Sequence, residues 1–172
     1  MEIEIRKANT QQVDPLFNLY RAVAGLKDGL IRRPDEITQD YVAGFLGKSQ
    51  ENGLCLVAHF MDEVIGEIHA TTPGIFAFQH LLTDLTIVVH PNYQGKGVGR
   101  KLFALFLDTI QNEYSHILRV ELYTREHNHR NIKFYESLGF VNEGRQHQKI
   151  YSSHERLETP LHMAWFNPFY NS

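Results

Sequence analysis

Three glycines alternate with other residues in the stretch HPNYQGKGVGRKL at positions 90–102: Gly95, Gly97 and Gly99. Each glycine raises the entropy cost of ordering a chain, so three together indicate a backbone that something must approach closely. The stretch follows an apolar run and precedes a helically periodic one, and this order presents backbone N–H groups at a helix N-terminus. Together with the helix dipole and the positive charges of Lys96 and Arg100, these groups predict a phosphate site.

Two well-known phosphate-binding motifs fit these glycines less well. A P-loop requires Ser or Thr directly after its lysine, and neither Lys96 nor Lys101 is followed by one. A dinucleotide fingerprint requires G-x-G-x-x-G near the start of its fold, whereas these glycines run G-x-G-x-G after two expected helices and a hairpin. The simplest alternative, a glycine-rich turn that only starts a helix, stays open.

Two motifs together resemble the GCN5-related N-acetyltransferase (GNAT) family. The segment QGKGVG, Gln94–Gly99, matches the family's [RQ]-x-x-G-x-[GA] signature, whose loop cradles the pyrophosphate of acetyl-CoA. The segment Asn128–Phe140 resembles the family's second block, N-x-x-A-x-x-x-Y-x-x-x-G-F, except that Asn131 stands where that pattern usually carries alanine. The tyrosine of this block is Tyr135, and it follows the loop at the expected spacing. Two motifs at the right spacing are far more specific than either one alone.

The resemblance implies where the co-substrate acetyl-CoA binds. The strand end Ile87–Val89 would carry a bulge that leaves backbone groups for the pantetheine arm, and the N–H of Val89 would polarise the acetyl carbonyl. The residues implied in cofactor binding are Ile87, Val88, Val89, Gln94, Gly95, Lys96, Gly97, Val98, Gly99, Arg100, Asn128, Asn131 and Tyr135. No metal is expected, because the ten histidines show no zinc-ligand spacing.

The implied reaction is a direct attack of an amine on the thioester, which requires an acid and a base. Tyr135 matches the family's tyrosine that protonates the departing sulfur, and phenol and thiol pKa values of about 10 and 8.5 permit that transfer. Its structural alternative is a core aromatic on an amphipathic helix. For the base, Asp84 on the central strand is the first candidate and Glu67 on the hairpin is the second. Strand parity decides which of them faces the cleft, and either one is otherwise a solvated strand-end charge.

Hydrophobic periodicity places these motifs in a mixed fold. Strand patterns are found at 2–8, 54–60, 64–70, 81–91, 119–124, 140–151 and 156–166. Helical patterns are found after Asn9, from Pro34 to Leu46, from Arg100 to Asn112 and from Asn128 to Leu138. This order predicts an α+β fold with a central, mostly antiparallel mixed sheet of six to seven strands and about four helices. The resemblance implies a GNAT-like sheet splayed at the acetyl-CoA site, in a single N-acetyltransferase domain spanning 1–172.

Composition and charge limit the class of protein. Of the 172 residues, 42% are hydrophobic and 22% charged, values that are ordinary for a soluble domain. The net charge of −3 gives no reason to expect a nucleic-acid partner. No apolar run approaches the ~20 residues of a membrane helix, and no secretory signal is found, so no membrane partner is expected. The single cysteine, Cys55, excludes an intramolecular disulfide and favours a cytoplasmic protein.

The resulting expectation is an acetyl-CoA-dependent N-acetyltransferase acting on a primary amine of a small molecule, amino acid, polyamine or peptide. Two other classes stay open: a catalytically silent acyl-CoA binder or sensor that keeps the loop, and a nucleotide-binding protein. The aromatic segment Trp165–Tyr170 is unusually apolar. It either caps the sheet or forms the contact of a homodimer, which is common in the family.

Overall fold

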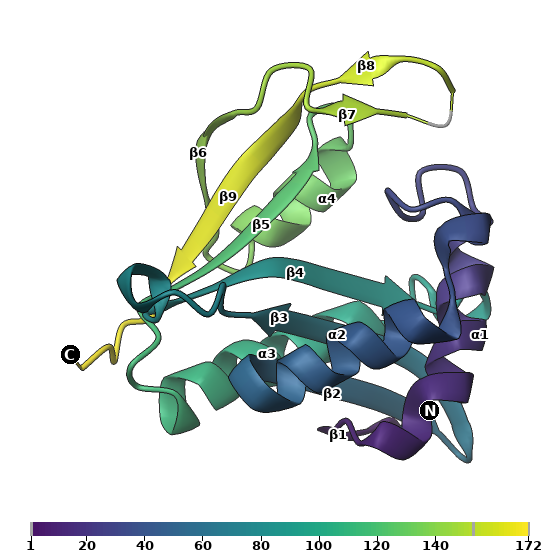
Figure 1. The fold of residues 1–172 in the computed structure, drawn as a ribbon, viewed down its shortest axis with the longest axis horizontal. Coiled ribbons are helices and arrows are strands. Elements are labelled where there is room, and N and C mark those ends of the chain that lie inside the picture. Colours follow the sequence, from purple (N-terminus) through teal and green to yellow (C-terminus); the bar gives the residue numbers. More distant parts are fainter. Residues whose placement is uncertain (1, 153, 172) are drawn as a thin grey trace. The chain divides into compact units, whose positions relative to one another are not determined.

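The computed structural model describes residues 2–152 and 154–171, which form two compact units. The first unit comprises the residues up to Thr71 together with Thr86–Asp108; the second comprises Thr72–Leu85 together with the residues from Thr109 onward. Seven strands form one sheet in the order β1-β2-β3-β4-β5-β9-β6, and β7 and β8 form a small second sheet (Figure 1). Strand β4, Leu81–Val89, contributes residues to both units.

The first unit contains three antiparallel strands and helices on either side of them. The strands are β1 (Glu4–Lys7), β2 (Gly53–Phe60) and β3 (Glu63–Thr71). The helices are α1 (Val13–Ala24), α2 (Gln39–Asn52) and, as far as Asp108, α3 (Val98–Glu113). Short 3₁₀ turns lie at Thr10–Gln12, Pro34–Glu36 and Pro91–Tyr93. Because β2 pairs with both β1 and β3 in antiparallel fashion, the predicted hairpin is confirmed.

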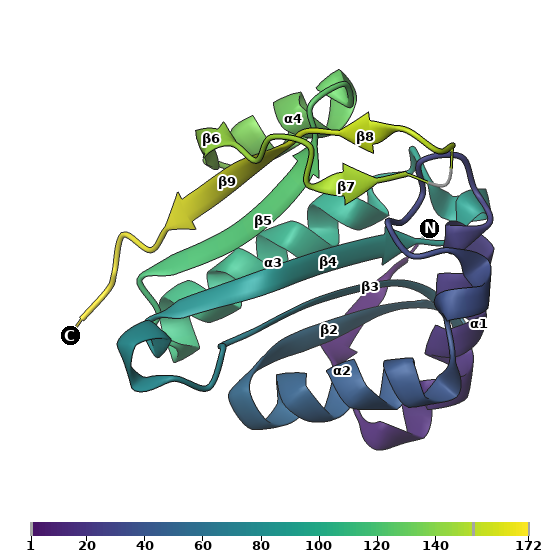
Figure 2. The same ribbon diagram turned by 45° about the horizontal axis from the view of Figure 1, so that its top comes forward.

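Alternation along β3 places the helices of the first unit on opposite faces of its strands. Glu67 and His69 contact side chains of α1 and α2, whereas a Cβ added to Gly66 would lie 2.9 Å from Leu102 on α3. Glycine therefore permits the close approach of α3 to β3. Figure 2 shows α2 lying alongside β2. The core on the α1 and α2 side includes Leu16, Leu19, Tyr20, Val42, Leu46 and Val57.

The second unit is built around a long antiparallel pair of strands. These are β5 (Arg119–Arg125) and β9 (Pro160–Phe166), in a register that sets Tyr123 opposite His162. The start of β4 runs parallel to β5, and β6 (Val141–Arg145) pairs with β9. Strands β7 (Ile150–Tyr151) and β8 (Leu157–Glu158) form the small hairpin. The helix α4 (His129–Glu136) is followed by Gly139 at φ +93°, a left-handed conformation that suits glycine.

The helices of the first unit begin where side chains cap them. The Asn9 side chain accepts a hydrogen bond from the N–H of Gln11 at 3.0 Å, so the first helical segment starts as predicted. Helix α2 begins at Gln39 and not at Pro34, because the Thr38 hydroxyl caps it by accepting from the N–H of Tyr41 at 3.1 Å. Pro34–Glu36 forms only a 3₁₀ turn.

The predicted fold class is confirmed by this architecture. Within the described residues, a mixed, mostly antiparallel sheet of seven strands is accompanied by four α-helices. In the same part of the chain, none of the helices combines the length and the apolar character that crossing a membrane would require.

Candidate active site

The predicted phosphate loop joins the end of β4 to the start of α3 in the first unit. Gly95 and Gly97 have φ angles of +74° and +84°, in the left-handed region that other residues enter at a cost. A Cβ added at either position would meet no atom within 4 Å, so the space beside these glycines is open. The backbone of this loop is therefore accessible from outside the protein.

Gly99 differs from the other two glycines because nothing in the described chain requires it. Its backbone does not have a left-handed φ, and an added Cβ would lie 3.7 Å from Val89 Cγ2 and 3.8 Å from Ile87 Cδ1. These are ordinary van der Waals distances that a side chain would tolerate. A ligand pressed against the first turn of α3 gives a reason for glycine here, as a pyrophosphate group at a helix N-terminus would.

Side chains hold the loop in place. The Gln94 amide donates to the Val89 carbonyl at 3.1 Å, and the N–H of Asn92 donates to His90 Nδ1 at 3.2 Å. The Tyr93 hydroxyl donates to Glu63 at 2.7 Å, and Lys96 Nζ lies 5.3 Å from the centre of the Tyr93 ring. The side chain of the signature glutamine thus ties the loop to the end of β4.

Burial separates the predicted cofactor residues into two kinds. Val88 and Val98 are each only 1% exposed, so only their backbone groups are accessible to a ligand. Lys96 and Arg100 are exposed, and Ile87 and Val89 are half-buried. These positions extend from the end of β4 through the loop into the first turn of α3, as the sequence predicts.

The second motif forms α4 of the second unit. The Asn128 side chain caps this helix by accepting from the N–H of Asn131 at 3.1 Å, so Asn128 has a structural part to play. The predicted acid, Tyr135, is nearly enclosed, with the rings of Phe134 and Phe140 at 5.6 and 6.0 Å. Burial raises the pKa of Tyr135 to about 12.

This raised pKa changes the proton transfer that the sequence suggested. Tyr135 keeps its proton throughout the neutral range, so it is able to donate a hydrogen bond to a developing thiolate. However, its pKa now exceeds that of an ordinary thiol by roughly 3.5, which opposes complete transfer to a free thiolate. If Tyr135 is the acid, this pKa favours delivery of its proton as the C–S bond breaks over protonation of a free thiolate.

The second candidate base, Glu67, is fully buried in the first unit. Its carboxylate accepts from the Tyr20 hydroxyl at 2.5 Å, from Cys55 Sγ at 3.1 Å, and lies 2.9 Å from His69 Nδ1. The ring of Phe45 stacks on His69 at 4.2 Å between centroids. We call Tyr20, Cys55, Glu67 and His69 the buried cluster. Burial and the charge of Glu67 raise the pKa of the Cys55 thiol, which keeps it protonated and weakly nucleophilic.

The first candidate base, Asp84, is exposed on β4 in the second unit. Its φ of +55° places it in the left-handed region, in the middle of a strand. Aspartate tolerates this conformation better than most residues, although such a backbone still costs on the order of 1–3 kcal/mol. This left-handed residue, the first candidate base, lies three residues before the Ile87–Val89 segment in which a bulge is expected.

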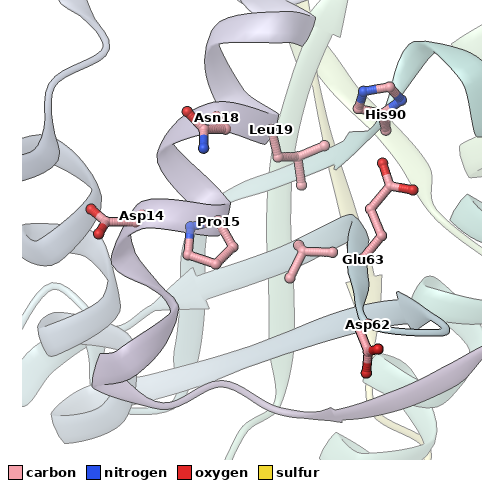
Figure 3. Close-up of a pocket in the computed structure, with 8 residues that line it drawn as sticks. Asp14, Pro15, Asn18, Leu19, Asp62, Glu63 and His90 are labelled. Atoms are coloured by element: carbon pink, nitrogen blue, oxygen red, sulfur yellow. The ribbon is translucent and has the colours of Figure 1, made fainter.

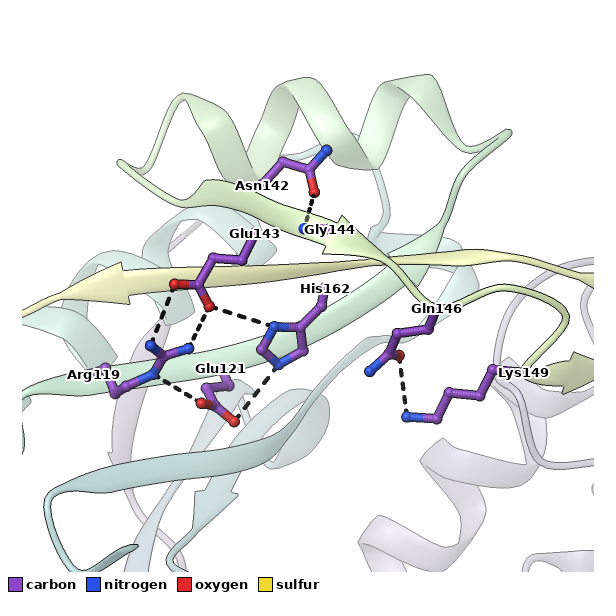
Figure 4. Close-up of polar contacts among 8 residues, drawn as sticks. All are labelled: Arg119, Glu121, Asn142, Glu143, Gly144, Gln146, Lys149 and His162. Atoms are coloured by element: carbon purple, nitrogen blue, oxygen red, sulfur yellow. Dashed lines mark hydrogen bonds and ion pairs between the residues drawn. The ribbon is translucent and has the colours of Figure 1, made fainter.

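Asp84 lines a hollow of about 210 Å³ in the second unit. The other lining residues are Thr83, Glu121, Leu122, Tyr123, Gln146, Lys149 and His162. Next to it, Arg119 forms ion pairs with Glu121 at 2.8 Å and with Glu143 at 2.5 Å (Figure 4). The His162 ring lies between the same two carboxylates, with distances of 3.6 and 3.5 Å. We call Arg119, Glu121, Glu143 and His162 the open cluster.

A larger hollow of about 430 Å³ lies in the first unit (Figure 3). It is lined by Asp14, Pro15, Asn18, Leu19, Asp62, Glu63, Val64 and His90. None of the sequence-predicted site residues lines it, and two of its carboxylates are already bonded. Asp14 accepts from Gln39 at 2.7 Å, and Glu63 accepts from Tyr93. Size alone therefore does not identify the site.

Sequence analysis did not single out the residues that share the hollow with Asp84, although the segment 146–158, which contains Gln146 and Lys149, was expected to help build the acceptor cleft. Glu121 and Tyr123 alternate on β5, so their common face was readable from the sequence. His162, Gln146 and Lys149 come from later segments, and only the β5–β9 register and the fold of the 146–149 turn bring them there. In the described part of the chain, no group of three or more His, Cys, Asp or Glu side chains is arranged to hold a metal ion.

Solved structures resemble this chain over nearly its whole length. An acetyltransferase of the GNAT family from Streptococcus pneumoniae has a TM-score of 0.86 at 22% identity, covering 96% of this chain and 99% of that one. The yncA protein of Salmonella typhimurium, a putative acetyltransferase solved with its cofactor acetyl-CoA, has a TM-score of 0.85 at 19% identity, covering 100% and 98%. At such identities the likeness concerns the fold, and it agrees with the predicted GNAT architecture.

Sequence comparisons identify the family. Among curated proteins, the L-amino acid N-acyltransferase MnaT of Escherichia coli (strain K12) is 33% identical over 64 residues. That segment covers 37% of this chain and 36% of the relative, little more than a third of either length. The profile of the acetyltransferase (GNAT) domain matches residues 51–142, more than half of the chain. The chain therefore belongs to the GNAT family of acetyltransferases.

Proposed function

We propose that residues 1–172 act as one acetyl-CoA-dependent N-acetyltransferase domain that transfers an acetyl group to a primary amine. The observation that carries this proposal is the loop Gln94–Gly99, where two glycines are required by their φ angles and the third has no structural reason of its own. Acetyl-CoA, the co-substrate typical of the family, would supply the acetyl thioester and its pyrophosphate would bind at this loop.

Asp84 is the proposed base. A primary amine with a pKa near 10 is protonated at neutral pH, so it must lose a proton before its nitrogen can attack. The nitrogen then forms a C–N bond to the acetyl carbon, the C–S bond breaks, and the products are an amide and a thiol. Exposure and a position on an irregular strand support Asp84, whereas complete burial beneath three hydrogen-bonding partners argues against Glu67.

Tyr135 is the proposed acid. Its enclosed position keeps the phenol neutral, which a donor to the departing sulfur requires. The N–H of Val89 is the proposed donor to the acetyl carbonyl oxygen, where negative charge develops during attack. Both roles are carried over from the family's motifs.

The acceptor is proposed to be a small-molecule, amino-acid, polyamine or peptide amine, and no nucleic acid or membrane partner is proposed. The curated relative named above acts on L-amino acids by its name, and its short aligned segment gives that class modest support. A cytoplasmic location is proposed, because the single cysteine, Cys55, allows no intramolecular disulfide. A homodimer is also proposed, since Phe166, Phe169 and Tyr170 are substantially exposed.

The test is release of free thiol from acetyl-CoA in the presence of a panel of amino acids, dipeptides, polyamines and aminoglycosides. We expect release with one class of amine, strongly slowed in Tyr135→Phe and unchanged in the control Tyr151→Phe, which alters an exposed tyrosine outside the proposed site and dimer contact. Gly99→Ala should weaken stabilisation by acetyl-CoA while the protein stays folded, because its Cβ meets only ordinary contacts.

Two negative outcomes separate the alternatives. If acetyl-CoA raises the melting temperature but no amine releases thiol, the protein is a silent acyl-CoA binder. If acetyl-CoA fails to bind and a nucleotide binds instead, the loop serves a different phosphate ligand and the proposal is wrong.

A further inference from the structure

The hollow beside Asp84 contains side chains of both charge signs, held apart from one another. Asp84 and Glu121 supply carboxylates, and Lys149 supplies an ammonium group. Figure 4 shows Lys149 with Gln146 as a pair separate from the open cluster. Within the described residues, Lys149 forms no ion pair with a carboxylate, although two carboxylates line the same hollow.

Two contacts hold the ammonium group of Lys149 in position. Its Nζ donates to Gln146 Oε1 at 3.1 Å, and it lies 4.7 Å from the centre of the Tyr123 ring. A hydrogen bond together with a cation–π contact restricts a side chain that would otherwise sample many rotamers. This positioning reduces the entropy that an anionic ligand would lose on binding there.

The orientation of Gln146 follows from its partner. An ammonium group only donates hydrogen bonds, so the amide oxygen of Gln146 faces Lys149 and its NH₂ group points elsewhere. That NH₂ group has no hydrogen-bond partner among the described residues, and Gln146 lines the hollow. One side of the hollow therefore offers the remaining N–H donors of Lys149 and those of Gln146.

The opposite charge is concentrated on β4 and β5. Glu121 is shared between Arg119 and His162, which fixes its carboxylate in place. Asp84, the proposed base, faces the same hollow from a different strand. An amine entering on this side would meet two carboxylates, whereas a carboxylate would meet Lys149 and Gln146.

We propose that this hollow binds the acceptor and selects a primary amine that also carries a carboxylate, with Lys149 and Gln146 as the residues that recognise the carboxylate. The proposal rests on the proposed N-acetyltransferase function and adds the class of acceptor. A volume of about 210 Å³, roughly that of seven water molecules, suits a small zwitterion such as a free amino acid. It is below the range of about 300–1,000 Å³ that drug-sized ligands occupy.

The experiment compares each of several free amino acids with its own carboxamide, which keeps the amine and loses the charge of the carboxylate. The pairs are alanine, methionine and glutamine with their α-amides, assayed by thiol release from acetyl-CoA. For the wild-type chain we expect kcat/KM for the acid to exceed that for the amide by roughly 10–100-fold, the range for a hydrogen-bonded charge. In Lys149→Met this ratio should fall to about one, mainly through a higher KM for the acid.

Matched variants separate recognition from general damage. Lys48→Met changes an exposed lysine on α2 of the other unit and should leave the ratio as in the wild type. Lys149→Glu should reverse the preference, so that the amides and 1,4-diaminobutane become better acceptors than the free acids. A wild-type chain that acetylates acids and amides equally well would overturn the proposal.

A binding measurement keeps this test independent of the proposed reaction. The same acids and amides are titrated against the wild-type chain and Lys149→Met, with coenzyme A present, and the shift in melting temperature is followed. If no compound releases thiol but the acids stabilise the wild-type chain more than Lys149→Met, the proposed reaction fails and the carboxylate site stands. If the acids stabilise both chains equally, the carboxylate site is wrong whatever the activity.

Discussion

The buried cluster of the first unit and the open cluster of the second are built from similar groups in opposite surroundings. Each combines glutamate and histidine, yet the side chains of Glu67 and His69 are 0% and 7% exposed, whereas those of Glu143 and His162 are 32% and 26% exposed. The buried cluster is completed by Tyr20 and Cys55, and the open cluster is completed by Arg119.

The difference shows what enclosure does to a carboxylate. Glu67 is removed from water, so it must be hydrogen-bonded inside the protein, and its partners come from α1, β2 and β3. These hydrogen bonds connect α1, β2 and β3, and they leave Glu67 buried out of reach of a substrate. Glu121 keeps contact with solvent and borders a hollow, so its charge acts on whatever enters there. The buried cluster is therefore expected to contribute more to stability than the open cluster, whose Glu121 also borders a hollow.

The largest expected effect is on stability, from Glu67→Ala. This change removes the shared hydrogen-bond partner of Tyr20 and His69, which keep only each other at 3.3 Å, and leaves a cavity, so the free energy of unfolding should fall by about 3–5 kcal/mol in urea denaturation. Cys55 should also react faster with a thiol reagent. The control is Asp84→Asn, which changes an exposed carboxylate that asparagine replaces at the same backbone angles, and its stability should change by less than about 0.5 kcal/mol. Equal stabilities would contradict the role assigned to the buried cluster.

The second prediction concerns Tyr135, a buried tyrosine of the second unit. Its pKa is about 12 when folded and about 10 when unfolded, so the folded state holds the proton more tightly. Its stabilising contribution is complete below pH 10 and is lost as the pH rises from 10 through 12, by about 2.7 kcal/mol in all. Unfolding measured at pH 9 and at pH 11.5 should show a smaller decrease for Tyr135→Phe than for the wild-type chain. Equal decreases would mean that Tyr135 is not enclosed as described.

The motifs and element types were predictable from the sequence because they depend on local order. The loop Gln94–Gly99, the Asn128 cap and the stop at Gly139 each use residues within a few positions of one another. The start of α2 was not predictable in this way, because Pro34–Asp35–Glu36 and Thr38–Gln39 both carry helix-start signals and the choice between them depends on packing.

The surroundings of the two candidate bases, Glu67 and Asp84, could not be predicted from the sequence. Asp84 was the first candidate base and Glu67 the second, but their burial differs because of contacts that no local sequence pattern contains. The partner of Glu67, Tyr20, lies 47 positions away, and no neighbouring residue in the sequence indicates the left-handed φ of Asp84. The hollow could not be predicted either, because His162 comes close to Glu121 only through the register of β5 and β9.

A third, smaller effect is expected from Arg119→Gln in the open cluster. The guanidinium is about one-fifth exposed and forms ion pairs with both Glu121 and Glu143, so its loss should lower the free energy of unfolding by roughly 1–2 kcal/mol. The change should be larger at low salt than at 1 M salt, because partly exposed charges are screened. A Glu143→Gln, Arg119→Gln double variant should lose less than the sum of the single variants, since the two residues are in contact. Additive losses would show that the pair does not interact in solution.

The smallest effect is expected from the pair of Arg145 and Glu126, which belongs to the same unit and is exposed to solvent. The two side chains are 59% and 43% exposed and lie 2.6 Å apart, so solvent screening cancels most of their attraction. Arg145→Gln should therefore leave the denaturation curve unchanged within error. The hydrogen bond from Arg145 still lowers the pKa of Glu126, and this variant should return that pKa towards its usual value in an NMR titration. A measurable loss of stability together with an unchanged Glu126 pKa would mean that Arg145 acts through packing and not through its charge. Solvent exposure of the charges would then no longer explain why changes in the buried cluster cost more stability than changes in the open cluster.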